Sequence, residues 1–256
     1  MSTFLFDKIV FGPVKSRRLG KSLGVNILYN NAKFCNFDCI YCECGWSLKV
    51  EDKQLPIVEQ VTTALENFLK NISKAEMPDV ITFAGNGEPT LHPNFDEIID
   101  NAIKIKNTYA PNVKIAVLTN ATQLYKQKVV EALKKIDLPI LKIDTVIQSD
   151  FELINRCNDN VSVSKIVDSI ISNFKNPIIQ TMFFKVQLDN YLFDNTRTDS
   201  LQEYFNTLNK IQPNTVMLYS VDRDTPMQGL EKIDLKHLQL IANEIEKLGF
   251  NTTVTQ

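Results

Sequence analysis

The 256-residue sequence predicts an α/β fold in which parallel strands form an open, partial (β/α)6 barrel. Short β-branched, apolar runs alternate with longer segments of helical period, which is typical of repeated βα units. Six such units can be counted, too few to close an eight-stranded barrel. Right-handed crossovers would place six parallel strands in one curved, open sheet. No Pro/Gly/Ser-rich linker interrupts the pattern, so we expect a single domain over residues 1–256.

Each predicted strand precedes a helical segment with one apolar face. The strands are expected at 23–28, 80–83, 114–118, 140–144, 178–184 and 216–220. Apolar residues at i, i+4, i+7 and i+8 predict helices over 57–69, 95–103, 129–133, 163–171 and 201–208. A last helix over 238–248 ends at Gly249, a suitable C-cap, and 251–255 could add an edge strand. The core is therefore expected at about 20–226, after a basic lead-in (1–19) and before a C-terminal extension (227–256).

Composition and charge exclude several classes of protein. The net charge of -2 gives no global basic field for nucleic acid. No signal peptide or membrane-spanning apolar run is present, and five cysteines, three of them close together, do not form a secreted disulfide framework. We therefore expect a reduced, cytoplasmic protein with no membrane partner. A local basic stretch is either a solvated surface or an anion site for a phosphate-bearing substrate or a redox partner. Its members are Lys8, Lys15, Arg17, Arg18, Lys21 and Lys33.

Three cysteines follow the first predicted strand with the spacing C-x3-C-x2-C. They are Cys35, Cys39 and Cys42, and no fourth cysteine falls in step. Three thiolates on a cubane of four irons leave one iron open for a substrate or cofactor. The alternative is a structural zinc site with Cys44 as the fourth ligand, but such sites usually join two widely separated ligand pairs. The spacing therefore predicts a [4Fe-4S] cluster, with Cys44 as a spectator or a residue of the substrate space.

The second predicted strand ends in the sequence Phe-Ala-Gly-Asn-Gly-Glu-Pro-Thr-Leu at 83–91. Gly85 and Gly87 allow the backbone to approach a ligand closely and to adopt positive φ. An ordinary strand-to-helix turn would explain the same glycines. Because functional loops of βα barrels follow the carboxyl ends of strands, we interpret this segment as a contact loop.

Polar residues at other predicted strand ends have two interpretations each. Lys142 and Asp144 alternate with apolar residues and share a face, either as ligand contacts or as a mutual ion pair. Gln180, among apolar neighbours, is a satisfied core residue or a ligand contact. Asn120 ends the third strand and could donate a hydrogen bond to a ligand. Arg223 is a substrate ligand or a local ion-pair partner of the aspartates beside it.

Two of these motifs resemble the radical S-adenosylmethionine (SAM) superfamily. The loop Cys-Asn-Phe-Asp-Cys-Ile-Tyr-Cys at 35–42 resembles its cluster loop. Asn86-Gly87-Glu88 resembles the Gly-Gly-Glu motif that holds the SAM amino group, with Asn86 in place of the first glycine. The segments 11–24, 85–93 and 141–145 resemble the wyosine-synthetase-like iron–sulfur oxidoreductases, a likeness that runs over about 9–226.

This resemblance implies that the open iron chelates SAM and that one cluster electron cleaves it. The products would be methionine and a 5′-deoxyadenosyl radical, which abstracts a substrate hydrogen. Lys142 would contact the SAM carboxylate or the substrate, and Asp144 and Gln180 the ribose. The implied cluster ligands are Cys35, Cys39 and Cys42. The implied cofactor contacts are Tyr41, Gly85, Asn86, Gly87, Glu88, Asn120, Lys142, Asp144 and Gln180, and the implied substrate contacts are Arg17, Arg18 and Arg223.

The resemblance leaves the substrate and partners open. A low-potential donor of the flavodoxin or ferredoxin type would supply the electron. The substrate would be a small molecule or an RNA base, with tRNA the less favoured of the two. An alternative is an activase that installs a glycyl radical on a partner protein. An alternative of another class is a structural or electron-transfer metal module without SAM chemistry.

Overall fold

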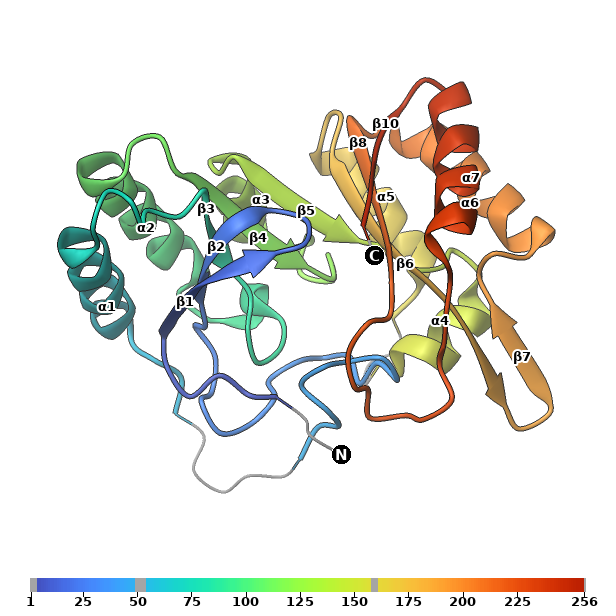
Figure 1. Cartoon of the computed structure of the whole chain (residues 1–256), viewed down its shortest axis with the longest axis horizontal. Helices are drawn as coiled ribbons and strands as arrows, with labels where there is room; N and C mark the ends of the chain where they lie inside the picture. The colour runs from blue at the N-terminus through green and yellow to red at the C-terminus, as the bar shows by residue number, and fades with distance from the viewer. Residues whose placement is uncertain (1–3, 49–53, 158–160, 256) are drawn as a thin grey trace.

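The protein is described by a computed structural model that covers residues 4–48, 54–157 and 161–255. Its described residues form one curved sheet with helices on its outer side (Figure 1). The strands are β1 (Val10–Ser16), β2 (Gly20–Val25), β3 (Val80–Phe83), β4 (Lys114–Thr119), β5 (Leu138–Lys142), β6 (Ile178–Leu188), β7 (Tyr191–Asp194), β8 (Thr215–Ser220), β9 (Glu231–Lys232) and β10 (Asn251–Val254). The α-helices are α1 (Val58–Asn71), α2 (Phe95–Tyr109), α3 (Gln127–Lys134), α4 (Gln148–Asn155), α5 (Val163–Asn173), α6 (Thr198–Ile211) and α7 (Leu235–Lys247).

The main sheet has the order β1-β2-β3-β4-β5-β6-β8-β10. All neighbours along this path are parallel except β1 and β2, which form an antiparallel hairpin. This mostly parallel, open sheet confirms the predicted fold class. The six predicted strands correspond to β2, β3, β4, β5, β6 and β8, and the predicted edge strand is β10.

Several boundaries differ from the sequence prediction, and three of these differences concern the site. The lead-in forms β1, because 10–16 pair with β2 instead of remaining an extension, and its residues 1–3 lie outside the described chain, as does residue 256. β2 ends at Val25, three residues early. β5 ends at Lys142, so Asp144 lies beyond the strand and not on it. Strand ends depend on pairing with neighbours, and β5 pairs with β6 only as far as Lys142.

Alternation along the strands separates two apolar layers. Ile81 and Val117 belong to the large core between the sheet and the helices. Val80, Ala116 and Met217 belong to a smaller cluster on the opposite, concave face. Because side chains alternate between faces, the concave residues of successive strands lie side by side in a row. The polar residues near the carboxyl ends of β5, β6 and β8 continue this row toward one rim of the sheet.

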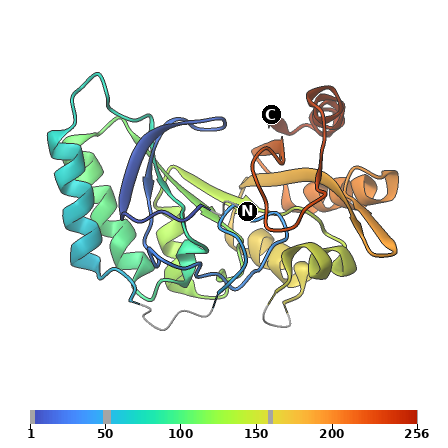
Figure 2. The same cartoon turned by 60° about the horizontal axis from the view of Figure 1, so that its bottom comes forward.

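The turn of the β1–β2 hairpin lies across the concave face. Leu19, within the turn, packs against the concave apolar cluster. Arg17 forms an ion pair with Asp222, just beyond β8, with an N–O distance of 3.0 Å. Gly20 has a φ of +71°, and a Cβ there would lie 2.5 Å from the Asp79 carboxylate, which accepts the next backbone N–H. The hairpin therefore connects β2 with β8 across the open side of the partial barrel (Figure 2).

None of the helices in the described residues is both long and apolar enough to cross a membrane.

Candidate active site

The cysteine loop, residues 33–47, is shaped by a buried ion pair. The Lys33 ammonium, whose side chain is 2% exposed, lies 2.8 Å from Asp38 Oδ1 and donates to the Gly45 carbonyl at 3.1 Å. Asp38 also accepts the Ser47 backbone N–H at 2.9 Å. One buried cation thus joins both ends of the loop. Lys33 belongs to the basic stretch of the sequence, and no pattern there indicated that its side chain would be buried and would join the two ends of this loop.

Two backbone hydrogen bonds attach the cysteine loop to α4. Asp38 donates to the Asn155 carbonyl at 2.9 Å, and Ile40 donates to the Ile154 carbonyl at 3.0 Å. The Asn155 side-chain amide then donates to Cys39 Sγ at 3.3 Å. On the other side, the Phe37 backbone N–H donates to Cys35 Sγ at 3.4 Å. Amide donors to sulfur are a common environment for iron–sulfur ligands, so this donor set fits a cluster.

The three thiols differ in acidity. Burial raises the pKa of Cys35, and it raises the pKa of Cys39 to about 11. The pKa of Cys42 is lowered to about 6, because the Cys44 thiol donates a hydrogen bond to it and the Lys33 ammonium is close. Cys44 also contacts the Gly85 carbonyl, with a distance of 3.3 Å from Sγ to the oxygen.

The glycine loop, residues 85–88, lies against the start of the cysteine loop. Phe34 donates to the Asn86 carbonyl at 2.7 Å, and Glu88 donates to the Phe34 carbonyl at 2.9 Å. Gly87 has a φ of +138°, and a Cβ there would lie 1.9 Å from the Phe34 carbonyl oxygen. A glycine is therefore required at position 87 for this close approach. The two motifs, about fifty residues apart in sequence, are joined through their backbones.

The side chain of Asn86 does not face the ligand space. It is fully buried and binds two other segments: it accepts from the Phe6 N–H at 2.9 Å in the N-terminal segment and donates to the Tyr29 carbonyl at 2.7 Å after β2. Since its own carbonyl is occupied by Phe34, we assign Asn86 to the support of the loop and not to ligand contact.

Glu88 lies beside the cavity but is already hydrogen-bonded. Its carboxylate accepts from the Thr119 hydroxyl and from the Asn120 N–H, both at 2.7 Å, and from Thr90. Burial raises the pKa of this carboxyl, and these donors oppose the increase. Glu88 thereby holds the end of β4 and positions Asn120, whose amide donates to Asn36 at 2.9 Å and lies 3.9 Å from Cys35 Sγ.

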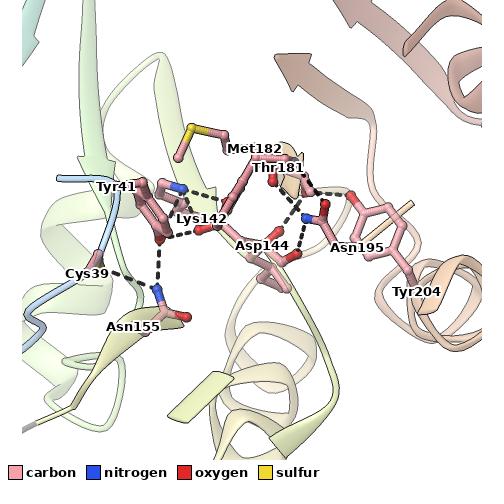
Figure 3. Close-up of polar contacts among 11 residues, drawn as sticks. Cys39, Tyr41, Lys142, Asp144, Asn155, Thr181, Met182, Asn195 and Tyr204 are labelled. Atoms are coloured by element: carbon pink, nitrogen blue, oxygen red, sulfur yellow. Dashed lines mark hydrogen bonds and ion pairs between the residues drawn. The ribbon is translucent and has the colours of Figure 1, made fainter. Parts of the chain in front are cut away.

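Asp144 is the centre of a buried polar network (Figure 3). It forms an ion pair with Lys142 at 2.5 Å and accepts the Tyr41 hydroxyl and, at 2.8 Å, the Met182 N–H. The Asn155 amide donates to the Tyr41 oxygen at 2.7 Å, which links this network to Cys39. Lys142 and Asp144 therefore form the mutual ion pair, although Asp144 lies beyond the strand. The Asp144 carboxylate also positions the Tyr41 hydroxyl.

Two nitrogen donors on the concave side lack partners. Gln180, on β6, is 3% exposed, and its Nε2 has no hydrogen-bond partner among the described residues. Arg18, in the hairpin turn, places its guanidinium 4.1 Å from the centre of the Tyr219 ring, and its buried Nη1 likewise has no partner in the described chain. The other two predicted substrate arginines are engaged elsewhere, Arg17 with Asp222 and Arg223 with Glu43 at 2.6 Å.

One cavity collects most of these side chains at the carboxyl ends of the strands. It includes the three cysteines, whereas Asn86, Arg17 and Arg223 are not among its lining residues. The predicted residues that line it are Arg18, Cys35, Cys39, Tyr41, Cys42, Gly85, Gly87, Glu88, Asn120, Lys142, Asp144 and Gln180.

Among the described residues, no three His, Cys, Asp or Glu side chains are gathered closely enough to bind one metal ion. A structural zinc site with Cys44 as the fourth ligand and a cluster held by three thiolates both remain to be tested by metal analysis.

Several cavity residues had no signal in the sequence. Asn155 ends a short helix, and Tyr219 and Met182 occur within apolar strands. Their roles depend on the sheet order, which places β6 beside β5 and β8. Strand alternation could have indicated that Tyr219 faces the same side as Met217.

Comparison with known proteins gives the same family. The model of the Radical SAM superfamily matches residues 29–172. A UPF0026 protein of Helicobacter pylori is 38% identical over 165 residues, which are 64% of this chain and 51% of that protein. A UPF0026 protein of Synechocystis sp. is 30% identical over 86% of this chain and 77% of its own length. The chain thus spans about half the length of the Helicobacter relative that it matches.

A solved structure has the same fold at low sequence identity. SuiB of Streptococcus suis, bound to its precursor peptide SuiA, superposes with a TM-score of 0.64 and 16% identity, over 90% of this chain and 48% of SuiB. The cysteine spacing, the open parallel sheet and the family match agree, and the chain belongs to the radical SAM superfamily.

Proposed function

We propose that this chain binds a [4Fe-4S] cluster through Cys35, Cys39 and Cys42 and uses it to cleave SAM reductively. The resulting 5′-deoxyadenosyl radical would abstract hydrogen from a small molecule or an RNA base. The observation that carries this proposal is the single cavity that contains all three thiols, the glycine loop and the polar ends of β4, β5 and β6. SuiB, which has the same fold, has also been crystallised with SAM.

The bound and reduced cluster would supply the electron for SAM cleavage at low potential. The protein would hold SAM beside the thiols, which makes the cleavage effectively intramolecular. Gly85, Gly87 and Glu88 are proposed to face its amino group, and Lys142 its carboxylate. Gln180, with an unpartnered buried donor, is proposed to contact the ribose.

Asp144 and Tyr41 are proposed to act by positioning. Asp144 is occupied by Lys142, Tyr41 and the Met182 N–H, so it keeps the Lys142 ammonium charged and directed into the cavity. The Lys142 ammonium also lies 4.6 Å from the centre of the Tyr41 ring, which adds a cation–π contact. Buried Met182 and Phe184, nearby on β6, would exclude water from the radical step.

We further propose a flavodoxin- or ferredoxin-type protein as the electron donor. The decisive experiment is anaerobic reconstitution with iron and sulfide, followed by dithionite and SAM. Formation of 5′-deoxyadenosine and methionine in equal amounts is expected. A protein that takes up iron but never cleaves SAM would leave the electron-transfer module as the better assignment. Uptake of one zinc ion without iron would contradict the proposal.

A further inference from the structure

Arg18 lies on the floor of the cavity, across from the cysteine loop. It lines the cavity at the carboxyl ends of the strands, and it also lines a second hollow at their amino ends, with Val80, Ile178 and Thr215. Each of these three is the first residue of its strand, β3, β6 and β8 respectively. The cysteine loop covers the opposite rim. A group bound by Arg18 would therefore occupy the end of the cavity that is farther from the thiols.

The guanidinium of Arg18 is held in place but not neutralised. Tyr219 lies under it at 4.1 Å, and the Ser16 hydroxyl accepts the Arg18 backbone N–H at 3.3 Å, which orders the turn. No ion pair joins Arg18 to any described residue, and its Nη1 is buried without a hydrogen-bond acceptor. A buried charged donor without an acceptor is costly. The neighbouring Arg17 has a carboxylate partner, so among the described residues of the hairpin Arg18 alone has a buried nitrogen without an acceptor.

The charges and donors around Arg18 favour an anion. The Lys142 ammonium lies 5.6 Å from the centre of the same Tyr219 ring, which therefore has two cations near it. Gln180 adds a second unpartnered N–H donor, and it pairs in register with Lys142 on β5. Arginine has donors and no acceptor, and its planar fork matches a carboxylate or a phosphate. The Lys142 charge is balanced by Asp144, and Lys142 and Gln180 face SAM in the proposed function, so the charge left for a substrate anion on the floor of the cavity is that of Arg18.

We propose that the substrate carries an anionic group, a carboxylate or a phosphate, and that Arg18 binds this group on the floor of the cavity. The inference rests on the proposed function, because it assumes that SAM occupies the rim beside the cysteines. It goes beyond that function in giving the substrate an anionic group and Arg18 as its ligand, while the carboxylate of SAM stays with Lys142.

The test uses simple anions in place of the unidentified substrate. Inorganic phosphate and, in a separate arm, acetate are titrated into the anaerobically reconstituted protein with SAM present, and binding is followed by calorimetry. R18Q should weaken binding of the preferred anion by about tenfold or more, because a charge-assisted hydrogen bond is lost. R18K, which keeps the charge but not the fork, should lie between R18Q and the wild type. K15Q removes a charge from an exposed position of the same hairpin and should bind the anion as the wild type does.

The SAM dissociation constant, measured in parallel, should be the same in R18Q as in the wild type. Equal anion affinity in R18Q and the wild type, or no binding of either anion by the wild type, would overturn the proposal. A loss of SAM affinity in R18Q would also overturn it, since Arg18 would then serve the cofactor. If reconstitution yields no cluster, the proposed function fails, and titration of the cluster-free protein still tests Arg18. Stronger binding of phosphate or of acetate indicates which anionic group the site prefers.

Discussion

The cysteine loop and the β1–β2 hairpin both lie across the opening of the sheet, but they are stabilised differently. The cysteine loop contains the Lys33–Asp38 ion pair, whose ammonium is nearly inaccessible, and backbone hydrogen bonds to α4 and to the glycine loop. The hairpin turn reaches β8 through the Arg17–Asp222 ion pair, in which the side chains are 29% and 38% exposed. Buried pairs break at high cost, whereas exposed pairs contribute little. The rim that holds the thiols is thus joined by buried contacts, whereas the turn that carries Arg18 is joined to β8 by an exposed ion pair.

The largest expected effect is at the thiols. Cys39→Ala should abolish both cluster assembly and SAM cleavage, because two thiolates no longer hold the cubane in the cavity. Iron and sulfide content and 5′-deoxyadenosine formation measure the result. Cys44→Ala is the matched control and should retain about four irons per chain. Loss of iron in C44A together with retention in C39A would contradict our ligand assignment.

The next largest effect is on the free energy of unfolding, and it compares the buried Lys33–Asp38 pair with the exposed Arg17–Asp222 pair. Asp38→Ala leaves the Lys33 ammonium with the Gly45 carbonyl as its remaining described acceptor, so it should lower the free energy of unfolding by about 3 kcal/mol. Asp222→Ala breaks exposed pairs and should lower it by less than about 1 kcal/mol. Urea unfolding of the cluster-free protein measures both values. Equal losses in the two variants would show that the loop and the hairpin do not differ in this way.

A smaller effect is expected on the reduction potential of the cluster when a hydrogen bond to a cysteine sulfur is removed. Asn155→Leu removes the amide donor that lies 3.3 Å from Cys39 Sγ, so the cluster should become harder to reduce and its potential more negative. Potentiometric titration followed by electron paramagnetic resonance gives the potential. Asn120→Leu removes a longer contact, 3.9 Å from Cys35 Sγ, and should shift the potential less. A potential in N155L equal to that of the wild type would exclude this hydrogen bond as a tuning contact.

The smallest effect is a pH dependence. Partial burial opposes ionisation of Asp38, but the hydrogen bond and charge of Lys33 and the hydrogen bonds from Ser47 together outweigh it, and the pKa of Asp38 is lowered from the ordinary value of 3.8. A lowered folded-state pKa contributes stability that is complete above 3.8 and is lost as the pH falls through the lower folded value. Unfolding free energies of the wild type and D38N, measured from neutral pH to acid, should converge as the pH falls below about 4. A difference that stays constant over this range would contradict the assignment.

Sequence periodicity and spacing predicted the parts of the site that are local. The three thiols, the glycine loop and the six parallel strands follow from short patterns. Alternation also predicted that Lys142 and Asp144 face one side, and the two side chains do meet, although the strand ends before Asp144. The partners of Asn86 could not be predicted, because Phe6 and Tyr29 are 80 and 57 residues away in sequence and meet it only in the folded chain. The same holds for Arg18, which lies over Tyr219, about 200 residues away in sequence.

The backbone contact between Phe34 and Gly87 has a consequence for how such a chain can diversify. It joins the thiol-bearing segment to the glycine loop without using any side chain of β6 or β8. Substitutions at Tyr219, which lies under Arg18, can therefore reshape the far wall while the contact between the cysteine loop and the glycine loop keeps its form. Selection can therefore change which substrate the far wall of the cavity binds without changing the contact between the cysteine loop and the glycine loop.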